Sequence, residues 1–159
     1  MGATILVVDD HEIVREGVRS LIKGARPEWE ICGEATNGAD AIEAAKALKP
    51  DVVILDITMP SMSGLEAASR IGKFGLGRRV LLFTMHESDR LTIEARQAGA
   101  QGYVMKSQAA RHLILAIDRV LCGGTFFGRP EAEAAPEKRM PPAKFGGPVF
   151  CMDLGLDFV

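Results

Sequence analysis

Five polar residues at the ends of apolar segments are the part of this sequence best suited to chemistry. Each closely follows a run of strand-forming hydrophobic residues, and together they are Asp9, Asp10, Asp56, Thr84 and Lys106. Hard divalent cations such as Mg²⁺ prefer oxygen ligands, and clustered carboxylates repel one another unless a cation lies between them. A lysine ammonium pairs with a carboxylate or with a phosphoryl oxygen. These residue types therefore point to a site for a divalent metal and a phosphoryl group.

The apolar segments alternate with stretches of helical periodicity. We expect strands near 3–9, 30–35, 51–56, 79–84 and 101–105, and helices near 11–24, 38–48, 63–74, 88–98 and 108–122. Continuous apolar strands are typical of a parallel sheet that helices cover on both faces. The sequence thus predicts an α/β fold with a doubly wound, parallel, five-stranded sheet. Ligands bind outside the carboxyl ends of the strands in such sheets, so the five polar residues should converge there.

Each member of this set has a simpler structural interpretation when it is taken alone. Asp10 can cap the helix that follows it, Asp56 can form a turn, and Lys106 can be a surface lysine. A helix cap accounts for one carboxylate but not for an adjacent pair aligned with a third on another strand, so we favour metal binding. Asp56 is then suited to act as an oxygen nucleophile that accepts a phosphoryl group.

The composition is that of an ordinary soluble globular protein. The 159 residues are 47% hydrophobic and 25% charged and carry a net charge of −2, so no basic field favours nucleic acid or an anionic membrane. No apolar run approaches the roughly 20 residues that span a bilayer, and the N-terminus lacks a signal-peptide pattern. We therefore expect a cytoplasmic protein without membrane contacts. The histidines lack zinc-site spacing and are expected to face solvent or to start helices; they are His11, His86 and His112.

The composition changes after Phe127. Residues 128–159 contain five of the eight prolines and show no sustained helical or strand period. We expect one domain over residues 1–127, followed by a mostly disordered, proline-rich tail over 128–159.

The polar residues and their surroundings resemble the receiver domain of two-component response regulators over roughly 3–124. The resemblance rests on Asp9-Asp10, Asp56, Met59-Pro60 followed by Gly64, Thr84, Tyr103 and Lys106. The segments 6–11, 98–103 and 106–107 are similar to the NarL/LuxR subgroup in particular. This resemblance implies a flavodoxin-like (βα)5 fold with the strand order 2-1-3-4-5.

The resemblance also implies a reaction and its ligands. Asp56 would accept a phosphoryl group from a sensor histidine kinase, or from a small phosphodonor, in a reaction that requires Mg²⁺. Asp10, Asp56 and the backbone carbonyl of Thr58 would bind Mg²⁺ directly, and Asp9 would bind it through water.

A conformational switch is implied in the same way. Thr84 and Lys106 would hold the phosphoryl group, and Tyr103 would turn inward as the face formed by the fourth helix, fifth strand and fifth helix rearranges. That face would control a transcriptional output or a partner, with a phosphorylation-dependent homodimer as one expectation. Members of the subgroup usually continue into a helix-turn-helix domain that binds DNA. Residues 128–159 are too few and too proline-rich to form such a domain. We therefore expect no DNA binding by this chain alone. A truncated regulator, a natural single-domain receiver and a product with an altered ending all stay open.

Other functions also remain open. A stand-alone receiver would serve as a phosphate sink that acts only through protein contacts, and a pseudo-receiver would have a broken site, whereas this set is complete. The tail is a candidate for a role in dimerisation. A hydrolase of the haloacid-dehalogenase type would need a second aspartate where Thr58 stands, and a larger chain. We therefore expect a signalling domain and not an enzyme.

Overall fold

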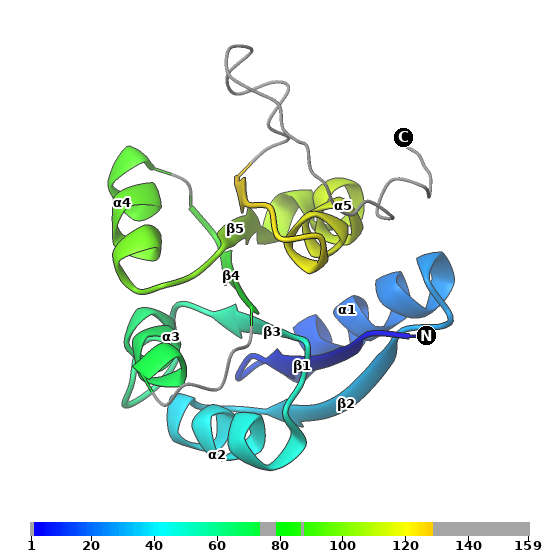
Figure 1. Ribbon diagram of the computed structural model, residues 1–159, viewed down its shortest axis with the longest axis horizontal. Coiled ribbons are helices and arrows are strands. Elements are labelled where there is room, and N and C mark those ends of the chain that lie inside the picture. Colours follow the sequence, from blue (N-terminus) through cyan, green and yellow to red (C-terminus); the bar gives the residue numbers. More distant parts are fainter. Residues whose placement is uncertain (1, 74–78, 87, 129–159) are drawn as a thin grey trace.

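A computed structural model of the protein describes residues 2–73, 79–86 and 88–128, in which helices cover both sides of a parallel sheet (Figure 1). The strands are β1 Thr4–Val8, β2 Glu30–Ala35, β3 Val52–Asp56, β4 Arg79–Thr84, β5 Gly102–Met105 and β6 Phe126–Phe127, in the sheet order 2-1-3-4-5-6. The helices are α1 Glu12–Ala25, α2 Gly38–Leu48, α3 Gly64–Lys73, α4 Asp89–Gln97 and α5 Ala109–Leu121, with a 3-10 turn at Lys106–Gln108. The predicted flavodoxin-like fold and the order of its first five strands are confirmed.

The sheet has one strand more than the sequence analysis predicted. β6 follows α5 and pairs in parallel with β5, where Gly102 lies opposite Phe126 and Tyr103 lies opposite Phe127. This pairing requires a glycine at position 102, because a Cβ atom there would lie 1.9 Å from the carbonyl oxygen of Phe126. A strand of two residues is too short to produce a hydrophobic period, so it emerges only in the tertiary structure.

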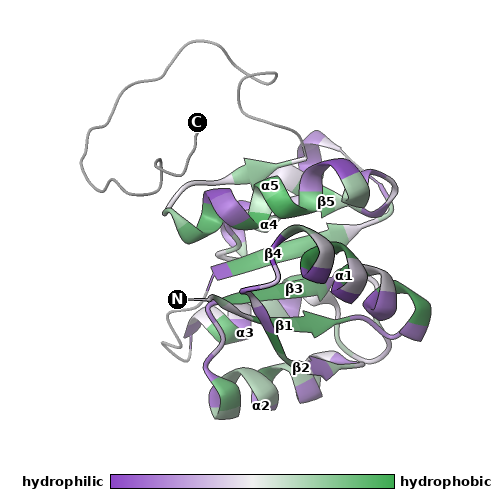
Figure 2. Cartoon of the chain, turned by 90° about the vertical axis from the view of Figure 1, so that its right-hand side faces the viewer, coloured by the Kyte–Doolittle hydropathy of each residue, from purple (hydrophilic) through white to green (hydrophobic). Residues whose placement is uncertain are grey.

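Two apolar cores hold the helices on the sheet, because successive side chains of a strand point to opposite faces. Ile5 and Val7 of β1 pack into the core beneath α1 and α5, whereas Leu6 and Val8 pack into the core beneath α2, α3 and α4. All four side chains are at most 1% exposed. The strands β1, β3 and β4 are mostly apolar on both faces for this reason, and in Figure 2 they are mainly green between helices that carry hydrophilic residues in purple.

Polar side chains at the first residue before α2 and α4 mark where these two helices begin. The Asn37 side chain caps α2 by accepting a hydrogen bond from the Asp40 N–H at 2.8 Å. The Ser88 hydroxyl caps α4 by accepting one from the Leu91 N–H at 3.0 Å. Short polar side chains at such positions satisfy N–H groups that have no partner within the helix.

Apart from Gly128, the predicted tail over 128–159 lies outside the described residues, so its boundary stays a prediction. Among the helices that the structure describes, each is too short or too polar to cross a lipid bilayer.

Candidate functional site

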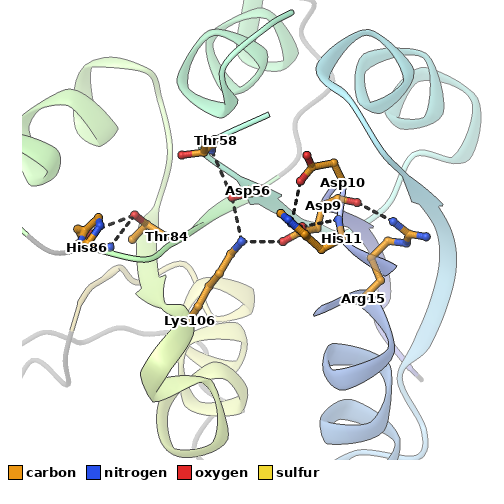
Figure 3. Close-up of polar contacts among 9 residues, drawn as sticks. All are labelled: Asp9, Asp10, His11, Arg15, Asp56, Thr58, Thr84, His86 and Lys106. Carbon is orange, nitrogen blue, oxygen red and sulfur yellow. Dashed lines mark hydrogen bonds and ion pairs between the residues drawn. The ribbon is translucent and has the colours of Figure 1, made fainter. Parts of the chain in front are cut away.

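Two buried carboxylates and a lysine meet at the carboxyl ends of β1, β3 and β5 (Figure 3). Asp9 directly follows β1, Asp56 ends β3, and Lys106 directly follows β5. The Nζ atom of Lys106 lies 3.0 Å from Asp9 Oδ2 and 3.2 Å from Asp56 Oδ1. The structure thus brings these three residues together, as the sequence predicts from the parallel strand arrangement. Their chemical roles stay predictions.

Burial and charge act against each other in this cluster. The side chains of Asp9 and Asp56 are 1% and 3% exposed, and that of Lys106 is 13% exposed. Burial, and then the negative charge of Asp9, raise the pKa of Asp56 above its usual value, although Lys106 opposes this shift. Burial alone would lower the pKa of Lys106, but its hydrogen bond to Asp9 and the charges of both carboxylates outweigh that effect and raise the pKa. The lysine is therefore held as a cation, and a further cation would favour the charged form of Asp56.

The carboxylates form an acidic pocket with the donor atoms that a divalent cation requires. One ligand atom each from Asp9, Asp10, His11 and Asp56 lie within 4.8 Å of one another. Asp10 occupies the rim of this pocket, where its side chain is 30% exposed. Among the described residues, none donates a hydrogen bond to the buried Oδ2 atom of Asp56. Because buried polar atoms normally have a partner, this oxygen and its neighbours fit a divalent metal.

The loop that follows β3 folds back over Asp56. The Thr58 N–H donates a hydrogen bond to Asp56 Oδ1 at 3.2 Å, and the Gly64 N–H donates one to the carbonyl oxygen of Ile57 at 2.8 Å. A Cβ atom at position 64 would lie 2.2 Å from the carbonyl oxygen of Asp56, so this close approach requires glycine. The loop therefore holds one oxygen of Asp56 in place. The backbone carbonyl of Thr58 as a metal ligand stays a prediction.

Thr84 lies at the end of β4, but its hydroxyl bonds within its own loop. The hydroxyl donates to the carbonyl oxygen of His86 at 3.1 Å and accepts from the His86 N–H at 3.2 Å. In Figure 3 the Thr84 side chain points to His86 and away from the contact between Lys106 and Asp56. The structure therefore places Thr84 at the expected edge without joining it to the acidic cluster, and its contact with a phosphoryl group stays a prediction.

Tyr103 lies inside the domain in this structure. Its side chain is 1% exposed, and its hydroxyl lies 3.3 Å from the hydroxyl of Thr92 in α4. Its ring packs edge-on against Phe127 of β6, with 6.2 Å between the ring centroids. The inward position expected on activation is thus the one already adopted, and the role of Tyr103 as a switch stays a prediction.

Two residues of the site were not assigned to it from the sequence. His11 precedes α1 and is 67% exposed, as expected, but its Nδ1 atom lies 3.0 Å from Asp10 Oδ1 and 3.2 Å from Asp9 Oδ1. Arg15 lies one turn later, where it donates to the carbonyl oxygen of Asp9 at 2.7 Å and to Glu34 at 2.7 Å. These bonds hold the turn that carries the acidic pair. Two features of the sequence could have indicated these residues. His11 directly follows the acidic pair, and Arg15 lies four residues, or about one helical turn, after His11.

Comparison with known protein families identifies the family to which this fold belongs. A family model described as the response regulator receiver domain matches residues 5–118. The chain belongs to the response regulator receiver family.

Among curated relatives, this receiver is 37% identical over 121 residues to the nitrate/nitrite response regulator protein NarL of Escherichia coli K12. That alignment covers 76% of this chain and 56% of NarL. The receiver is also 39% identical over 119 residues to the transcriptional regulatory protein YdfI of Bacillus subtilis, which covers 75% of this chain and 55% of YdfI. The chain thus spans a little over half the length of these two relatives.

Solved structures agree with this assignment. A LuxR-family two-component response regulator from Aurantimonas sp. SI85-9A1 is 38% identical, with a TM-score of 0.78 over 84% of this chain and 94% of that one. The signal receiver domain of a NarL from Mycobacterium tuberculosis is 34% identical, with a TM-score of 0.72 over 77% of this chain and 98% of that one. The resemblance of this receiver to the NarL/LuxR subgroup is confirmed.

Proposed function

We propose that this receiver is the phosphoacceptor of a two-component regulatory system and that Asp56 accepts a phosphoryl group from a sensor histidine kinase. The observation that carries the proposal is the position of Lys106 Nζ between the carboxylates of Asp9 and Asp56 at the carboxyl edge of the sheet. Membership in the receiver family supports it. A carboxylate that is buried, oriented by a backbone N–H and paired with a fixed cation is a suitable oxygen nucleophile.

In the proposed reaction, an oxygen of Asp56 attacks the phosphorus atom of a phosphohistidine or of a small phosphodonor. A new P–O bond forms as the bond between phosphorus and the donor atom breaks, and the donor leaves with that electron pair. Mg²⁺, held by Asp10, Asp56 and the Thr58 carbonyl and through water by Asp9, would neutralise the charge of the group in transfer. Lys106 then binds an oxygen of the phosphoryl group on Asp56.

We further propose that Thr84 and Tyr103 report the modification. The phosphoryl group adds a charge of about −1.5 to −2 and new acceptor oxygens, by analogy with other phosphorylated side chains. The Thr84 hydroxyl would exchange the backbone of His86 for a phosphoryl oxygen, which moves the loop before α4. Tyr103 packs beneath α4, so it would transmit that movement to the face formed by α4, β5 and α5. A shift in the population of two conformations would then change how this face binds a second copy or another partner.

The proposed role is signalling in the cytoplasm and not enzymatic turnover, because the phosphoryl group is stored on a side chain of the protein itself. Control of transcription by this chain would act through protein contacts. A net charge of −2 gives no basic field for binding DNA directly.

Phosphorylation is tested by incubation with acetyl phosphate and Mg²⁺, followed by intact-mass measurement. We expect the wild type to gain one phosphoryl group and Asp56→Asn to gain none. Asp89→Asn, which alters an exposed carboxylate of α4, is the matched control and should behave as the wild type. Chelation of the metal should abolish the gain. Equal labelling of wild type and Asp56→Asn would refute the proposal, as would a wild type that gains nothing.

A further inference from the structure

We propose that Phe127 of β6 is a positioning residue for Tyr103: it packs on the side of β5 that faces away from β4 and keeps the tyrosine ring inside the domain independently of phosphorylation. The inference deepens the proposed function and rests on it for the role of Tyr103 as a switch. It adds the last described strand of the sheet to the parts of the domain that set the balance between the two positions of this ring.

Tyr103 has a neighbouring residue on each side in the sheet. It lies opposite Leu82 of β4 on one side and opposite Phe127 of β6 on the other. All three side chains lie in or against the core beneath α2, α3 and α4, so they share one face of the sheet. Because β4 and β6 are the two strands that flank β5, a ring that turns away from β4 moves toward β6. Phe127 therefore occupies the side on which Tyr103 would leave the core.

Contacts with Phe127 and with the residue after it hold the Tyr103 ring in place. The two rings pack edge-on, with 6.2 Å between their centroids and 70° between their planes. The Gly128 N–H donates to the carbonyl oxygen of Tyr103 at 2.9 Å, and a Cβ atom at position 128 would lie 3.0 Å from the tyrosine hydroxyl oxygen. That hydroxyl also lies 3.3 Å from the hydroxyl of Thr92 in α4. The ring is thus enclosed by β6 and by α4.

Phe127 is itself held from the side of α4. The guanidinium carbon of Arg96 lies 4.2 Å from the centroid of the Phe127 ring, a distance at which a cation is attracted to an aromatic ring. Arg96 belongs to the last turn of α4. The arginine, the phenylalanine and the tyrosine therefore lie in one continuous set of contacts. A movement of α4 would change the position of Phe127 as well as that of Tyr103.

The other residue of β6 anchors the strand from the opposite face of the sheet. Successive residues of a strand point to opposite faces, and Phe126 is 2% exposed in the core beneath α1 and α5. Its ring centroid lies 5.5 Å from that of His112 in α5. Removal of the Phe127 ring should therefore leave β6 paired with β5 and open only the face that holds Tyr103.

The test follows Tyr103 directly, because it is the only tyrosine in the sequence. A fluorinated tyrosine incorporated into the full chain gives one fluorine resonance, and its shift between light and heavy water measures how far the ring is exposed to solvent. An edge-on aromatic pair changes an equilibrium between two ring positions by roughly two- to tenfold. We expect Phe127→Ala to raise the exposed fraction of Tyr103 by that factor, whereas Phe127→Leu keeps an apolar side chain in place and should stay close to the wild type.

Two arginines of α4 provide a second variant and its matched control. Arg96→Gln removes the cation that lies over Phe127 and should raise the exposure of Tyr103 in the same direction, but less than Phe127→Ala. Arg90→Gln alters an arginine that is 86% exposed and pairs with Glu94, so it should behave as the wild type. Circular dichroism and urea unfolding establish that each variant is folded.

An unchanged Tyr103 signal in folded Phe127→Ala would overturn the inference. It would also be overturned if Phe127→Leu exposed Tyr103 as much as Phe127→Ala does, or if Arg90→Gln had the same effect as Arg96→Gln. If Phe127→Ala does not fold, Arg96→Gln decides the matter, and a Tyr103 signal that stays as in the wild type would refute the proposed role.

The same measurements with beryllofluoride and Mg²⁺ separate this inference from the proposed function. Beryllofluoride should return Tyr103 of Phe127→Ala to the buried signal, because a phosphoryl analogue favours the inward conformation. Exposure that persists although Asp56 is shown to accept a phosphoryl group would mean that Phe127 does not act on the switch. If no protein gains a phosphoryl group from acetyl phosphate, yet Phe127→Ala still exposes Tyr103, the proposed function fails while the positioning role of Phe127 stands.

Discussion

Replacement of Lys106 by methionine removes the cation that lies between two buried carboxylates and keeps a side chain of similar length. Asp9 and Asp56 then face each other without the ammonium group that contacts them at 3.0 and 3.2 Å. We expect Lys106→Met to lower the free energy of unfolding at neutral pH, because an uncompensated charge in the interior is strongly destabilising.

The burial of the three groups determines the size of this effect. Loss of an exposed ion pair changes stability by at most about 1 kcal/mol, whereas removal of one partner from a buried pair costs about 3–5 kcal/mol. The two carboxylate side chains are 1% and 3% exposed and the lysine 13%, so the buried range applies. Backbone N–H groups still bind one oxygen of Asp9 and one of Asp56, at 2.9 and 3.2 Å. We therefore expect a loss at the lower end of this range, which is about 3 kcal/mol in the free energy of unfolding or roughly 10 °C in Tm.

The loss should depend on pH and on Mg²⁺. The pKa of Asp56 is already raised above its ordinary value of 3.8 by burial and by Asp9, and removal of Lys106 raises it further. A carboxyl group whose pKa is higher in the folded state destabilises the fold above that pKa, and this penalty disappears as the pH falls through it. The difference between wild type and Lys106→Met should thus shrink as the pH falls through the raised pKa of Asp56. Saturating Mg²⁺ should reduce it, because the ion replaces the missing positive charge.

Urea unfolding followed by circular dichroism, over a series of pH values from neutral to acidic and with or without Mg²⁺, measures these effects. The matched background is Asp56→Asn, in which only the Asp9 carboxylate remains beside Lys106. We expect Lys106→Met to cost less in that background than in the wild type, which a double-mutant cycle quantifies. A loss below 1 kcal/mol, or one that grows as the pH falls, would show that Lys106 does not stabilise two buried charges.

Four further predictions concern single positions in the domain and are measured by chemical denaturation. Gly64→Ala should destabilise by about 2 kcal/mol or more, because its Cβ would lie 2.2 Å from the carbonyl oxygen of Asp56. Gly72→Ala in α3 meets nothing within 4 Å and should stabilise by about 0.5–1 kcal/mol, so a loss there would contradict this account. Asn37→Ala should cost about 1 kcal/mol through loss of the α2 cap, and no change would mean that the cap is irrelevant. Burial alone would raise the pKa of Glu34, but hydrogen bonds from two arginines of α1 outweigh it and lower that pKa. Glu34→Gln should therefore lose at most about 1 kcal/mol at pH 7, and this deficit should shrink as the pH falls through the lowered pKa. A deficit that grows as the pH falls would refute this assignment.

Much of the architecture could be predicted because the required signals are local and repeated. Runs such as 52–55 are apolar at every position, which is stable only in a strand that is covered on both faces, and the structure buries this one in full. Parallel strands share one carboxyl edge, so the residue that ends or follows each run had to lie near the others. The convergence of Asp9, Asp56 and Lys106 followed from that rule alone.

Hydrophobic pattern and residue type were therefore enough to predict the fold class, the order of the main elements and the set of acidic and basic groups at one edge. Three features became visible only in the packed fold: the addition of β6, the bonding of the Thr84 hydroxyl to His86, and the approach of the His11 ring to the acidic pair. Each of these depends on a side-chain rotation or on the approach of two distant backbones, as at Gly102 and Phe126. Such choices are separated by small free energies that depend on surrounding atoms, and hydrophobic period and residue type carry no information about them.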